Sequence, residues 1–302
     1  MFDNSSELHG KKVFGRKVLS PCWIPKFSFD YIKICSLAYT NLIRSQLIDL
    51  DVSVEKILPT PLWCNANFKK WERLKHERIP DRIFIIGNGP SLQVSDLNTL
   101  HSHQEHSFAF NKIYLAFENT SYRPTYYVVE DILVAKNNKQ SIDKLNGFPK
   151  FFPEFITRQL AVSGADYVYG LNCPHDKSPY AIEPSVDFLN FGWGGAVTCT
   201  AIQIALYMGH KEIFLLGVDN SFKCNTNNAQ EKHLIGQGES NHFHPNYRPI
   251  GEKWNPPYEN ITNQHFLMLQ DLSKCMEAEI INCTRGGNVE VFERANFDEI
   301  VS

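Results

Sequence analysis

A glycine-rich turn, Gly87-Asn88-Gly89-Pro90-Ser91, follows the apolar run RIFII. The run is rich in β-branched residues, so we expect a buried strand that ends at the turn. Two glycines allow the backbone to turn tightly and to approach a ligand, and Ser91 can cap the next helix and leave its N–H groups pointing at an anion. The turn is therefore predicted to hold the phosphate of a nucleotide. The alternative is a strand-to-helix corner that binds nothing.

Polar side chains also end the other apolar runs that we expect to be strands. Asn111 follows SFAF, and its amide, like that of Asn88, suits a base or a ribose hydroxyl, although each Asn is also a good turn former. Glu130 and Asp131 end the run TYYVV, where one can hold Mg²⁺ with substrate phosphates, or Asp131 can cap a helix. Asp219 ends the run FLLGV. Ligands bind at the carboxyl ends of parallel strands, so we expect these five side chains on one rim.

Gly194 and Gly195 stand directly before a helical pattern that includes Thr198. Backbone N–H groups at the start of that helix can receive a phosphate, with the Thr198 hydroxyl beside them. The alternative is that the glycines only allow the helix to pack closely.

Two histidines, His242 and His244, are separated by one residue in a segment that also contains Tyr247 and Arg248. An imidazole with a pKa near neutrality can remove a proton from a sugar hydroxyl, so we expect one of the two to be a general base. Tyr247, Arg248 or Lys253 would steady a departing phosphate. No cysteine or carboxylate stands at zinc-ligand spacing, so we predict no metal site. Solvated loop histidines are the alternative.

A scaffold of alternating strands and helices would position these residues. The expected elements are strands at 83–87, 107–111, 125–131, 213–217 and 279–283 and helices at 198–208 and 261–278. Such alternation is typical of an α/β fold, here Rossmann-like, with a mostly parallel sheet and helices on both of its faces.

Two segments lie outside this alternation. Residues 1–76 are expected to form a helical N-terminal extension, with an amphipathic helix over 27–50, a connector at Pro59 and Pro61, and a charged helix at 69–78. The amphipathic helix would pack on the main domain or lie on a membrane surface. Residues 220–260 are rich in Asn, Gly, Pro and His, so we predict a lid over the rim, within a catalytic domain of residues 77–302.

Composition and charge restrict the class of protein. The chain has 302 residues and a net charge of −3, which disfavours a nucleic-acid partner and leaves small anionic ligands open. None of its eight cysteines forms a CxxC pair, which favours a reducing cytosol over a disulfide framework or a zinc site. We find no signal-peptide core and no apolar run near the ~20 residues that cross a bilayer. We therefore expect a cytoplasmic protein, soluble or peripheral at the inner face of the membrane; the sequence does not decide whether it forms a homo-oligomer.

Taken together, the motifs IIGNGPSL, FAFNKIYL, PTYYVVED, GGAVTCTAIQIALYMGHKEIFLLGVD and HFHPNY resemble a bacterial family of 6-hydroxymethylpterin diphosphokinase-like proteins. The family is related to motility-accessory flagellin glycosyltransferases and is similar to bacterial lipooligosaccharide sialyltransferases. The resemblance covers about residues 82–291. In the sialyltransferases this turn and a strand-end Asn bind the CMP of a CMP-sugar, and a His in the lid is the general base. The resemblance therefore implies donor binding by Asn88, Gly89, Ser91 and Asn111 and catalysis by His242 or His244.

The chain departs from the sialyltransferase pattern in three places. Glu130-Asp131 stands where those enzymes have a third strand-end Asn, and Trp193-Gly194-Gly195 stands where they have a Ser. They also carry two tyrosines that hold the leaving phosphate, whereas this chain has no tyrosine between Asp219 and Asn246. Donor identity and leaving-group stabilisation are the properties that these departures affect.

The sequence thus predicts a glycosyltransferase that moves a sialic-acid-like sugar from a CMP-activated donor to a bacterial surface or flagellar glycan. The transfer would invert the anomeric carbon and require no metal cofactor. Pterin diphosphokinases place acidic residues at the strand end that matches Glu130-Asp131, so a Mg²⁺-dependent diphosphokinase that uses ATP is the alternative. A nucleotide-binding scaffold without turnover is the third class.

Overall fold

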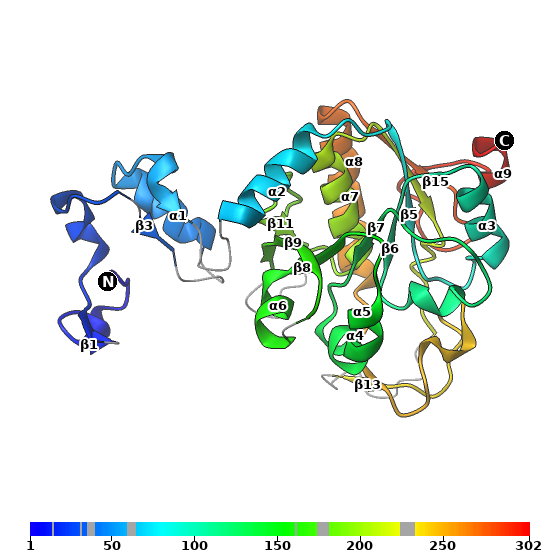
Figure 1. Cartoon of the computed structure of the whole chain (residues 1–302), viewed down its shortest axis with the longest axis horizontal. Coiled ribbons are helices and arrows are strands. Elements are labelled where there is room, and N and C mark those ends of the chain that lie inside the picture. Colours follow the sequence, from blue (N-terminus) through cyan, green and yellow to red (C-terminus); the bar gives the residue numbers. More distant parts are fainter. Residues whose placement is uncertain are drawn as a thin grey trace. The chain divides into compact units, whose positions relative to one another are not determined.

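The computed structural model describes residues 1–13, 15–30, 32–34, 40–58, 65–160, 162–173, 181–223 and 233–302. The chain divides into two compact units, Met1–Cys64 and Asn65–Ser302 (Figure 1). The boundary lies before the charged helix that the sequence analysis placed in the N-terminal extension. That helix, α2 (Asn65–His76), belongs to the larger unit, because its Trp71 is fully buried and stacks on Phe188.

The smaller unit consists of short elements. They are the 3-10 helices η1 (Ser6–Leu8), η2 (Pro21–Lys26) and η3 (Val54–Lys56), the helix α1 (Thr40–Asp49), and the strands β1 (Lys12–Val13), β2 (Arg16–Lys17), β3 (Ile32–Lys33) and β4 (Ile57–Leu58). β1 pairs antiparallel with β2, and β3 pairs parallel with β4. A small core contains Ile24, Ile34, Leu47, Val52 and Ile57.

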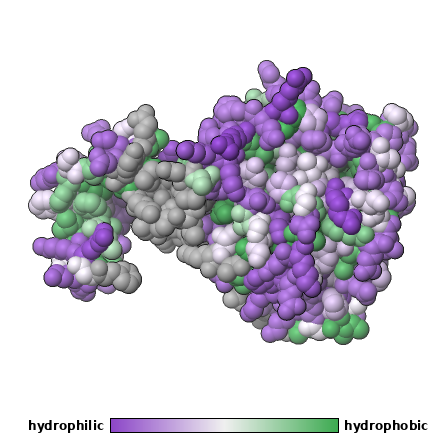
Figure 2. All heavy atoms as spheres, viewed as in Figure 1, coloured by the Kyte–Doolittle hydropathy of each residue, from purple (hydrophilic) through white to green (hydrophobic). Residues whose placement is uncertain are grey.

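The prediction of one amphipathic helix over 27–50 is wrong for residues 27–30 and 32–34. Residues Ile32–Lys33 form β3, and their backbone groups pair with β4, which a helix at this place would prevent. Residues 35–39 and the connector prolines lie outside the described residues. Trp23, Phe27 and Leu42 are exposed by 47%, 47% and 66%, and Figure 2 shows hydrophobic atoms on the surface of this unit. Contact with a membrane through this unit stays a prediction.

The larger unit contains an eight-stranded sheet in which every pair of neighbours is parallel. Its strand order is β16-β15-β12-β5-β6-β7-β8-β9. The bounds are β5 (Arg82–Ile86), β6 (Ser107–Phe110), β7 (Tyr126–Val128), β8 (Lys150–Pro153), β9 (Ala165–Tyr169), β12 (Glu212–Leu216), β15 (Glu279–Asn282) and β16 (Glu293–Arg294). The chain starts at β5, proceeds outward to β9, and returns to β12 on the other side of β5. The prediction of a Rossmann-like α/β fold is confirmed.

Helices cover both faces of this sheet (Figure 1). Apolar residues alternate along the strands, so that Ile83 and Ile85 face one side while Phe84 and Ile86 face the other. On the Phe84 side, one core joins α3 (Val94–Ser102), α4 (Ile132–Asn137), α5 (Lys139–Lys144), α6 (Glu154–Leu160) and α9 (Phe297–Ile300). The other side carries α2, α7 (Val197–Met208) and α8 (Glu259–Cys275).

The helix α7 is the central helix of its layer. It is buried at every residue from Thr198 to Met208, and it ends at Gly209, whose φ of 97° places it in the left-handed conformation. Its neighbour α8 lies beside it in Figure 1. The predicted helices at 198–208 and 261–278 and the five predicted strands all have counterparts in the structure. No helix among the described residues is long and apolar enough to cross a membrane.

Shorter elements complete the unit. They are η4 (Ile113–Ala116), η5 (Pro245–Tyr247), the parallel pair β10 (Leu171–Asn172) and β11 (Phe191–Gly192), and the antiparallel pair β13 (Leu234–Ile235) and β14 (Lys253–Trp254). The last pair and η5 belong to the predicted lid, of which residues 224–232 lie outside the described part of the chain.

Candidate functional site

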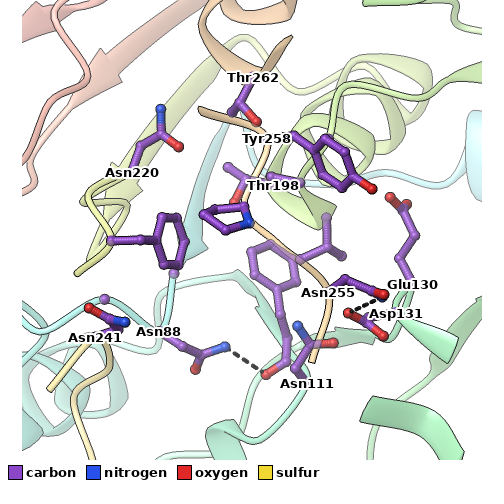
Figure 3. A pocket seen from close by; sticks show the side chains of 18 of the residues that line it. Asn88, Asn111, Glu130, Asp131, Thr198, Asn220, Asn241, Asn255, Tyr258 and Thr262 are labelled. Carbon is purple, nitrogen blue, oxygen red and sulfur yellow. Dashed lines mark hydrogen bonds between the residues drawn. The ribbon is translucent and has the colours of Figure 1, made fainter. Parts of the chain in front are cut away.

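A cavity of about 410 Å³ opens at the carboxyl ends of β5, β6, β7 and β12 (Figure 3). The strands β5 and β12 are neighbours at which the direction of chain progression through the sheet reverses. Open α/β sheets bind ligands at such a switch point. The strand ends and the start of α7 form one side of the cavity, and residues of the lid form the other.

The cavity gathers most of the residues that the sequence analysis singled out. The lining includes Gly87, Asn88, Gly89, Asn111, Glu130, Asp131, Gly195, Thr198, Asp219, His242, Tyr247 and Arg248. Five predicted residues lie outside it, although all five belong to the described part of the chain: Pro90, Ser91, Gly194, His244 and Lys253. The rim predicted from the strand ends is therefore present, but parts of the glycine turn and the histidine pair are placed elsewhere.

The glycine turn packs against the protein itself. A Cβ at Gly87 would overlap the carbonyl oxygen of Gly217, and a Cβ at Gly89 would overlap Asp219 Oδ2 and lie 2.6 Å from Cγ of the same side chain. The Ser91 hydroxyl donates to Asp219 Oδ2 at 2.7 Å, and the Ser91 N–H donates to the same oxygen at 3.4 Å. In this structure the Asp219 carboxylate occupies the Ser91 hydroxyl and N–H, and binding of a ligand phosphate by Ser91 stays a prediction. Burial raises the pKa of Asp219, and its hydrogen bonds with Ser91 act in the opposite direction.

The predicted capping of the next helix by Ser91 is wrong. The helix α3 begins at Val94, and the N–H of Gln93 donates to Asp96 Oδ2 at 3.0 Å. A capping box two residues further along thus replaces the predicted serine cap.

Asn88 and Asn111 face the cavity with unused acceptors. Asn88 Nδ2 donates to the Phe110 carbonyl at 3.1 Å, whereas its Oδ1 is buried and has no partner among the described residues. Asn111 Oδ1 is likewise buried and has no hydrogen-bond partner among the described residues. The φ of Asn111 is 48°, a left-handed conformation that asparagine tolerates better than most residues. Leaving a buried acceptor unpaired costs about 1–3 kcal/mol, so both side chains suit a ligand that supplies donors.

The N-terminus of α7 is the part of the cavity best suited to an anion. Gly195, Val197 and Thr198 line the cavity there, and the N-cap is Ala196, which has no polar side chain to satisfy the first N–H groups. Gly195 has a φ of 80° and leaves no room for a side chain, since a Cβ would lie 2.8 Å from that of Tyr258. Gly194 has a packing role instead, because a Cβ there would overlap the His265 ring.

The lid contributes one cation and two stacked rings to the cavity. Arg248 lies over the Trp254 ring at 3.5 Å, and its Nη1 is buried without a partner among the described residues. The His242 ring stacks on Tyr247 with centroids 3.8 Å apart and an interplanar angle of 6°. The lid thus presents a positive charge next to a flat aromatic surface.

The two histidines of the predicted general-base pair lie in different environments, and the role of either as a general base stays a prediction. Burial, together with the nearby Arg248 and Lys112 cations, lowers the pKa of His242 to about 3, so its imidazole stays neutral and is only weakly basic. His244 Nδ1 accepts a hydrogen bond from the N–H of Asn246 at 3.1 Å and caps η5 outside the cavity. His242 is therefore suited to neutral hydrogen bonding with a ligand.

Three contacts fasten the lid to the strand ends. Lys112 Nζ lies 2.8 Å from both carboxylate oxygens of Glu252 and 2.7 Å from the carbonyl oxygen of Tyr247, and Lys112 is only 4% exposed. The N–H of Phe243 donates to the Asn88 carbonyl at 3.1 Å. Asn255 Nδ2 donates to Asp131 Oδ2 at 3.1 Å (Figure 3). Sequence reasoning missed Lys112, Glu252 and Asn255, since nothing local marks a lysine and a glutamate that pair across 140 positions.

Glu130 and Asp131 have different environments. Asp131 caps α4 as one of the sequence alternatives foresaw: its Oδ1 accepts from the N–H groups of Leu133 and Val134, at 2.7 and 3.2 Å. Glu130 is 7% exposed, and its Oε2 accepts from the Tyr169 hydroxyl at 3.2 Å. Burial raises the pKa of Glu130 to about 7. Figure 3 shows the two side chains pointing in different directions from the end of β7.

Aromatic residues form another part of the cavity wall. Phe155, Trp193 and Tyr258 line it, and the rings of Trp193 and Tyr258 meet edge to face with centroids 5.0 Å apart. Such a surface suits a sugar or a planar ring. The sequence analysis named Trp193 only as part of a glycine motif, and an isolated aromatic residue carries no signal that separates a cavity wall from a core. In the described part of the chain, no group of three or more His, Cys, Asp or Glu residues is placed to hold a metal ion.

Comparison with known proteins gives two family matches. A family model described as 6-hydroxymethylpterin diphosphokinase MptE-like matches residues 62–225, and one described as C2185-like, N-terminal, matches residues 1–58. The junction between the two matches lies close to the division between the compact units. No curated protein matches the chain.

One similar solved structure is that of the MAf glycosyltransferase from Magnetospirillum magneticum AMB-1. It is 15% identical, with a TM-score of 0.42, over 72% of this chain and 34% of that protein's chain. The chain thus spans about a third of that protein, and at this level of similarity nothing about function follows. The first family match, in contrast, covers more than half of the sequence and agrees with the predicted resemblance. The chain therefore belongs to the 6-hydroxymethylpterin diphosphokinase MptE-like family.

Proposed function

We propose that the chain is a transferase that binds a nucleotide-activated donor in this cavity and passes a group to an acceptor hydroxyl. The proposed donor is a CMP-activated, sialic-acid-like sugar, and the proposed acceptor is a bacterial surface glycan. The observation that carries the proposal is the pair of buried amide oxygens on Asn88 and Asn111, which have no partner in the described part of the chain and lie at the switch point of the sheet. These acceptors require a ligand with hydrogen-bond donors.

A nucleotide supplies both donors and negative charge. Its base and ribose carry N–H and O–H groups for the two asparagines, and its phosphates suit the N–H groups at the start of α7. Arg248 Nη1, buried and unpartnered among the described residues, is available to the same phosphates. We place the phosphate at α7 and not at the glycine turn, because the donors of Ser91 bond to Asp219 and the N–H groups of Gly87 and Gly89 bond to backbone carbonyls.

The aromatic wall supports a sugar as the transferred group. Phe155, Trp193 and Tyr258 provide apolar and edge-on surfaces beside the strand ends. In the proposed step the acceptor oxygen attacks the anomeric carbon in line with the departing phosphate, which inverts that carbon. Arg248 and the α7 N–H groups stabilise the charge that develops on the phosphate.

The alternative is a diphosphokinase that uses ATP and Mg²⁺, and the name of the family favours it. Glu130 and Asp131 stand at the strand end where Mg²⁺ would be held, with hard oxygen ligands. Asp131, however, already accepts two backbone N–H groups through Oδ1 and Asn255 through Oδ2. A Mg²⁺ ion at Asp131 would compete with Asn255 for Oδ2, a contact that fastens the lid.

A thermal-shift series tests the proposal. CMP and CMP-N-acetylneuraminic acid, each with EDTA, are compared with ATP in the presence and absence of Mg²⁺. Ligand at 100 times Kd stabilises a protein by about 2.7 kcal/mol, which for a unit of this size is roughly 5–10 °C. We expect this shift with CMP and its sugar, a much smaller one in Arg248→Gln, and an unchanged one in Arg73→Gln, which alters an exposed arginine of α2. A shift with ATP only when Mg²⁺ is present would reverse the choice, and no shift with any of these ligands would contradict both candidates.

A further inference from the structure

We propose that Glu130, rather than either lid histidine, is the catalytic residue that takes the proton from the acceptor hydroxyl. The inference rests on the proposed function, because it assumes that the cavity hosts a transfer to a hydroxyl group. The proton acceptor is thus a carboxyl group that the sequence analysis considered only as a ligand for Mg²⁺ or as a residue that contacts the nucleotide donor.

The position of Glu130 follows from the alternation of β7. Tyr126 and Val128 face the α7 side of the sheet, and Glu130 continues this parity, so its side chain turns toward α7 and Tyr169. There it is 7% exposed, and the surface that it retains lines the cavity. The Tyr169 hydroxyl donates a hydrogen bond to its Oε2 at 3.2 Å. Tyr169 is itself fully buried, so this contact fixes the carboxyl group at the cavity wall.

The other carboxylates of the cavity are committed to structural contacts. Asp131 caps α4 and binds Asn255. Asp219 holds the glycine turn through Ser91. Protonating either one would weaken contacts that shape the site, whereas protonating Glu130 leaves a neutral acid that can still accept from Tyr169.

The charge environment of Glu130 supports a role in proton transfer. Burial raises the pKa of Glu130 to about 7, the neighbouring Asp131 carboxylate acts in the same direction, and the hydroxyls of Thr200 and Tyr169 oppose them. Two thiols, Cys173 and Cys199, interact electrostatically with it; desolvation, and then the Glu130 charge, raises the pKa of both, so they stay neutral near pH 7. A general base whose pKa lies near the working pH is largely ionised and still basic enough to take a proton. His242, with a pKa of about 3, is too weakly basic for this.

The step balances as follows. The acceptor oxygen forms a bond to the anomeric carbon while the bond between that carbon and the donor phosphate oxygen breaks, and the electron pair of that bond leaves with the nucleotide. The hydroxyl proton passes to the ionised Glu130 carboxylate. The protonated carboxyl group then loses the proton to solvent after the product departs.

The test compares full-length wild type, Glu130→Gln, His242→Gln and Glu212→Gln. Glu212 lies on β12 at the opposite end of the sheet and is exposed, so its variant is the matched carboxyl control. The probe is CMP-N-acetylneuraminic acid with water as acceptor, and the released CMP is measured from pH 5 to 9. Binding of CMP is followed separately by thermal shift.

We expect kcat of Glu130→Gln to fall at least 100-fold while the CMP-induced shift is retained, since general base catalysis contributes about 10²–10⁴ in rate. The wild-type rate should rise with pH through about 7, and His242→Gln and Glu212→Gln should keep this rising limb of the pH–rate profile. In Glu130→Gln the limb should be absent. A purely structural carboxyl group would change stability without removing the limb.

Each further outcome is decisive. A CMP shift with a Glu130→Gln rate within tenfold of wild type, or with the pH limb preserved, overturns the assignment of Glu130 and leaves the proposed function intact. Loss of the limb in His242→Gln alone returns the role to the histidine. No CMP shift and no released CMP in the wild type overturn the proposed function and this inference with it.

Discussion

Replacing Gly89 with alanine should destabilise the larger unit by about 4–9 kcal/mol. The new Cβ would overlap Asp219 Oδ2 and lie 2.6 Å from Asp219 Cγ and 2.8 Å from the Gly217 carbonyl oxygen. Overpacking of this kind costs about 1–3 kcal/mol. Moving the Asp219 carboxylate also breaks its hydrogen bonds with Ser91, each worth about 1.5–3 kcal/mol because the acceptor is charged. The free energy of unfolding from urea titration is the quantity to measure.

A double-mutant cycle makes the prediction specific. In Gly89→Ala/Asp219→Ala the atoms that clash most are gone, so the double variant should be more stable than the sum of the two single effects by about 1–3 kcal/mol. Gly87 provides the matched control. Its Cβ would overlap the backbone of Gly217, which Asp219→Ala leaves in place, so Gly87→Ala and Asp219→Ala should add. If Gly89→Ala were neutral, or if its effect and that of Asp219→Ala were simply additive, the packing of the turn against Asp219 would not be the reason for the glycine.

Four further predictions concern the site and the smaller unit. Burial raises the pKa of Glu130 from 4.5 to about 7, so the contribution of Glu130 to the free energy of unfolding is fully present below about pH 4.5 and falls by about 3 kcal/mol as pH rises from there through 7. Glu130→Gln should lack this fall, and identical pH profiles of unfolding for the two proteins would refute the prediction. Asn111→Gly should weaken CMP binding about 5- to 10-fold in calorimetry, as expected for one lost hydrogen bond, whereas Glu277→Gly, which alters another left-handed residue, should leave the affinity unchanged. Lys112→Met should cost about 3–5 kcal/mol in urea unfolding because it strands the Glu252 carboxylate, and Lys112→Met/Glu252→Gln should recover most of this; no recovery would mean that the ion pair does not anchor the lid. Lys12 and Lys17 face each other across the β1–β2 pair, so Lys12→Glu/Lys17→Glu should lower co-sedimentation with anionic vesicles at least tenfold if the smaller unit contacts membranes, and an unchanged bound fraction would argue against that contact.

The rim of the site could be predicted because its signals are local. A polar residue directly after an apolar β-branched run marks the carboxyl end of a strand, and parallel strands bring such ends together. This reasoning placed Asn88, Asn111, Glu130, Asp131 and Asp219 at one cavity, where the structure has them. The helix α7 was predicted almost to its bounds for the same reason, since periodicity and a terminal glycine are both written in adjacent residues.

The chemistry within the rim could not be predicted because it depends on distant partners. Ser91 donates a hydrogen bond to Asp219 across 128 positions, a contact inside the protein that nothing in the local sequence indicates. The low pKa of His242 arises from burial under the lid and from two cations that only the fold brings near. In the smaller unit, helical periodicity over 27–50 was misleading, because the pairing of β3 with β4 overrides local propensity at Ile32–Lys33.

A crystal structure of the full chain soaked with CMP tests the central claim most directly. We predict that the base or ribose donates to Asn88 Oδ1 and Asn111 Oδ1, that the phosphate lies at the first N–H groups of α7 within reach of Arg248, and that Asp219 keeps its contact with Ser91. A nucleotide bound away from the two asparagines, or a phosphate that displaces Asp219 from the glycine turn, would contradict this account.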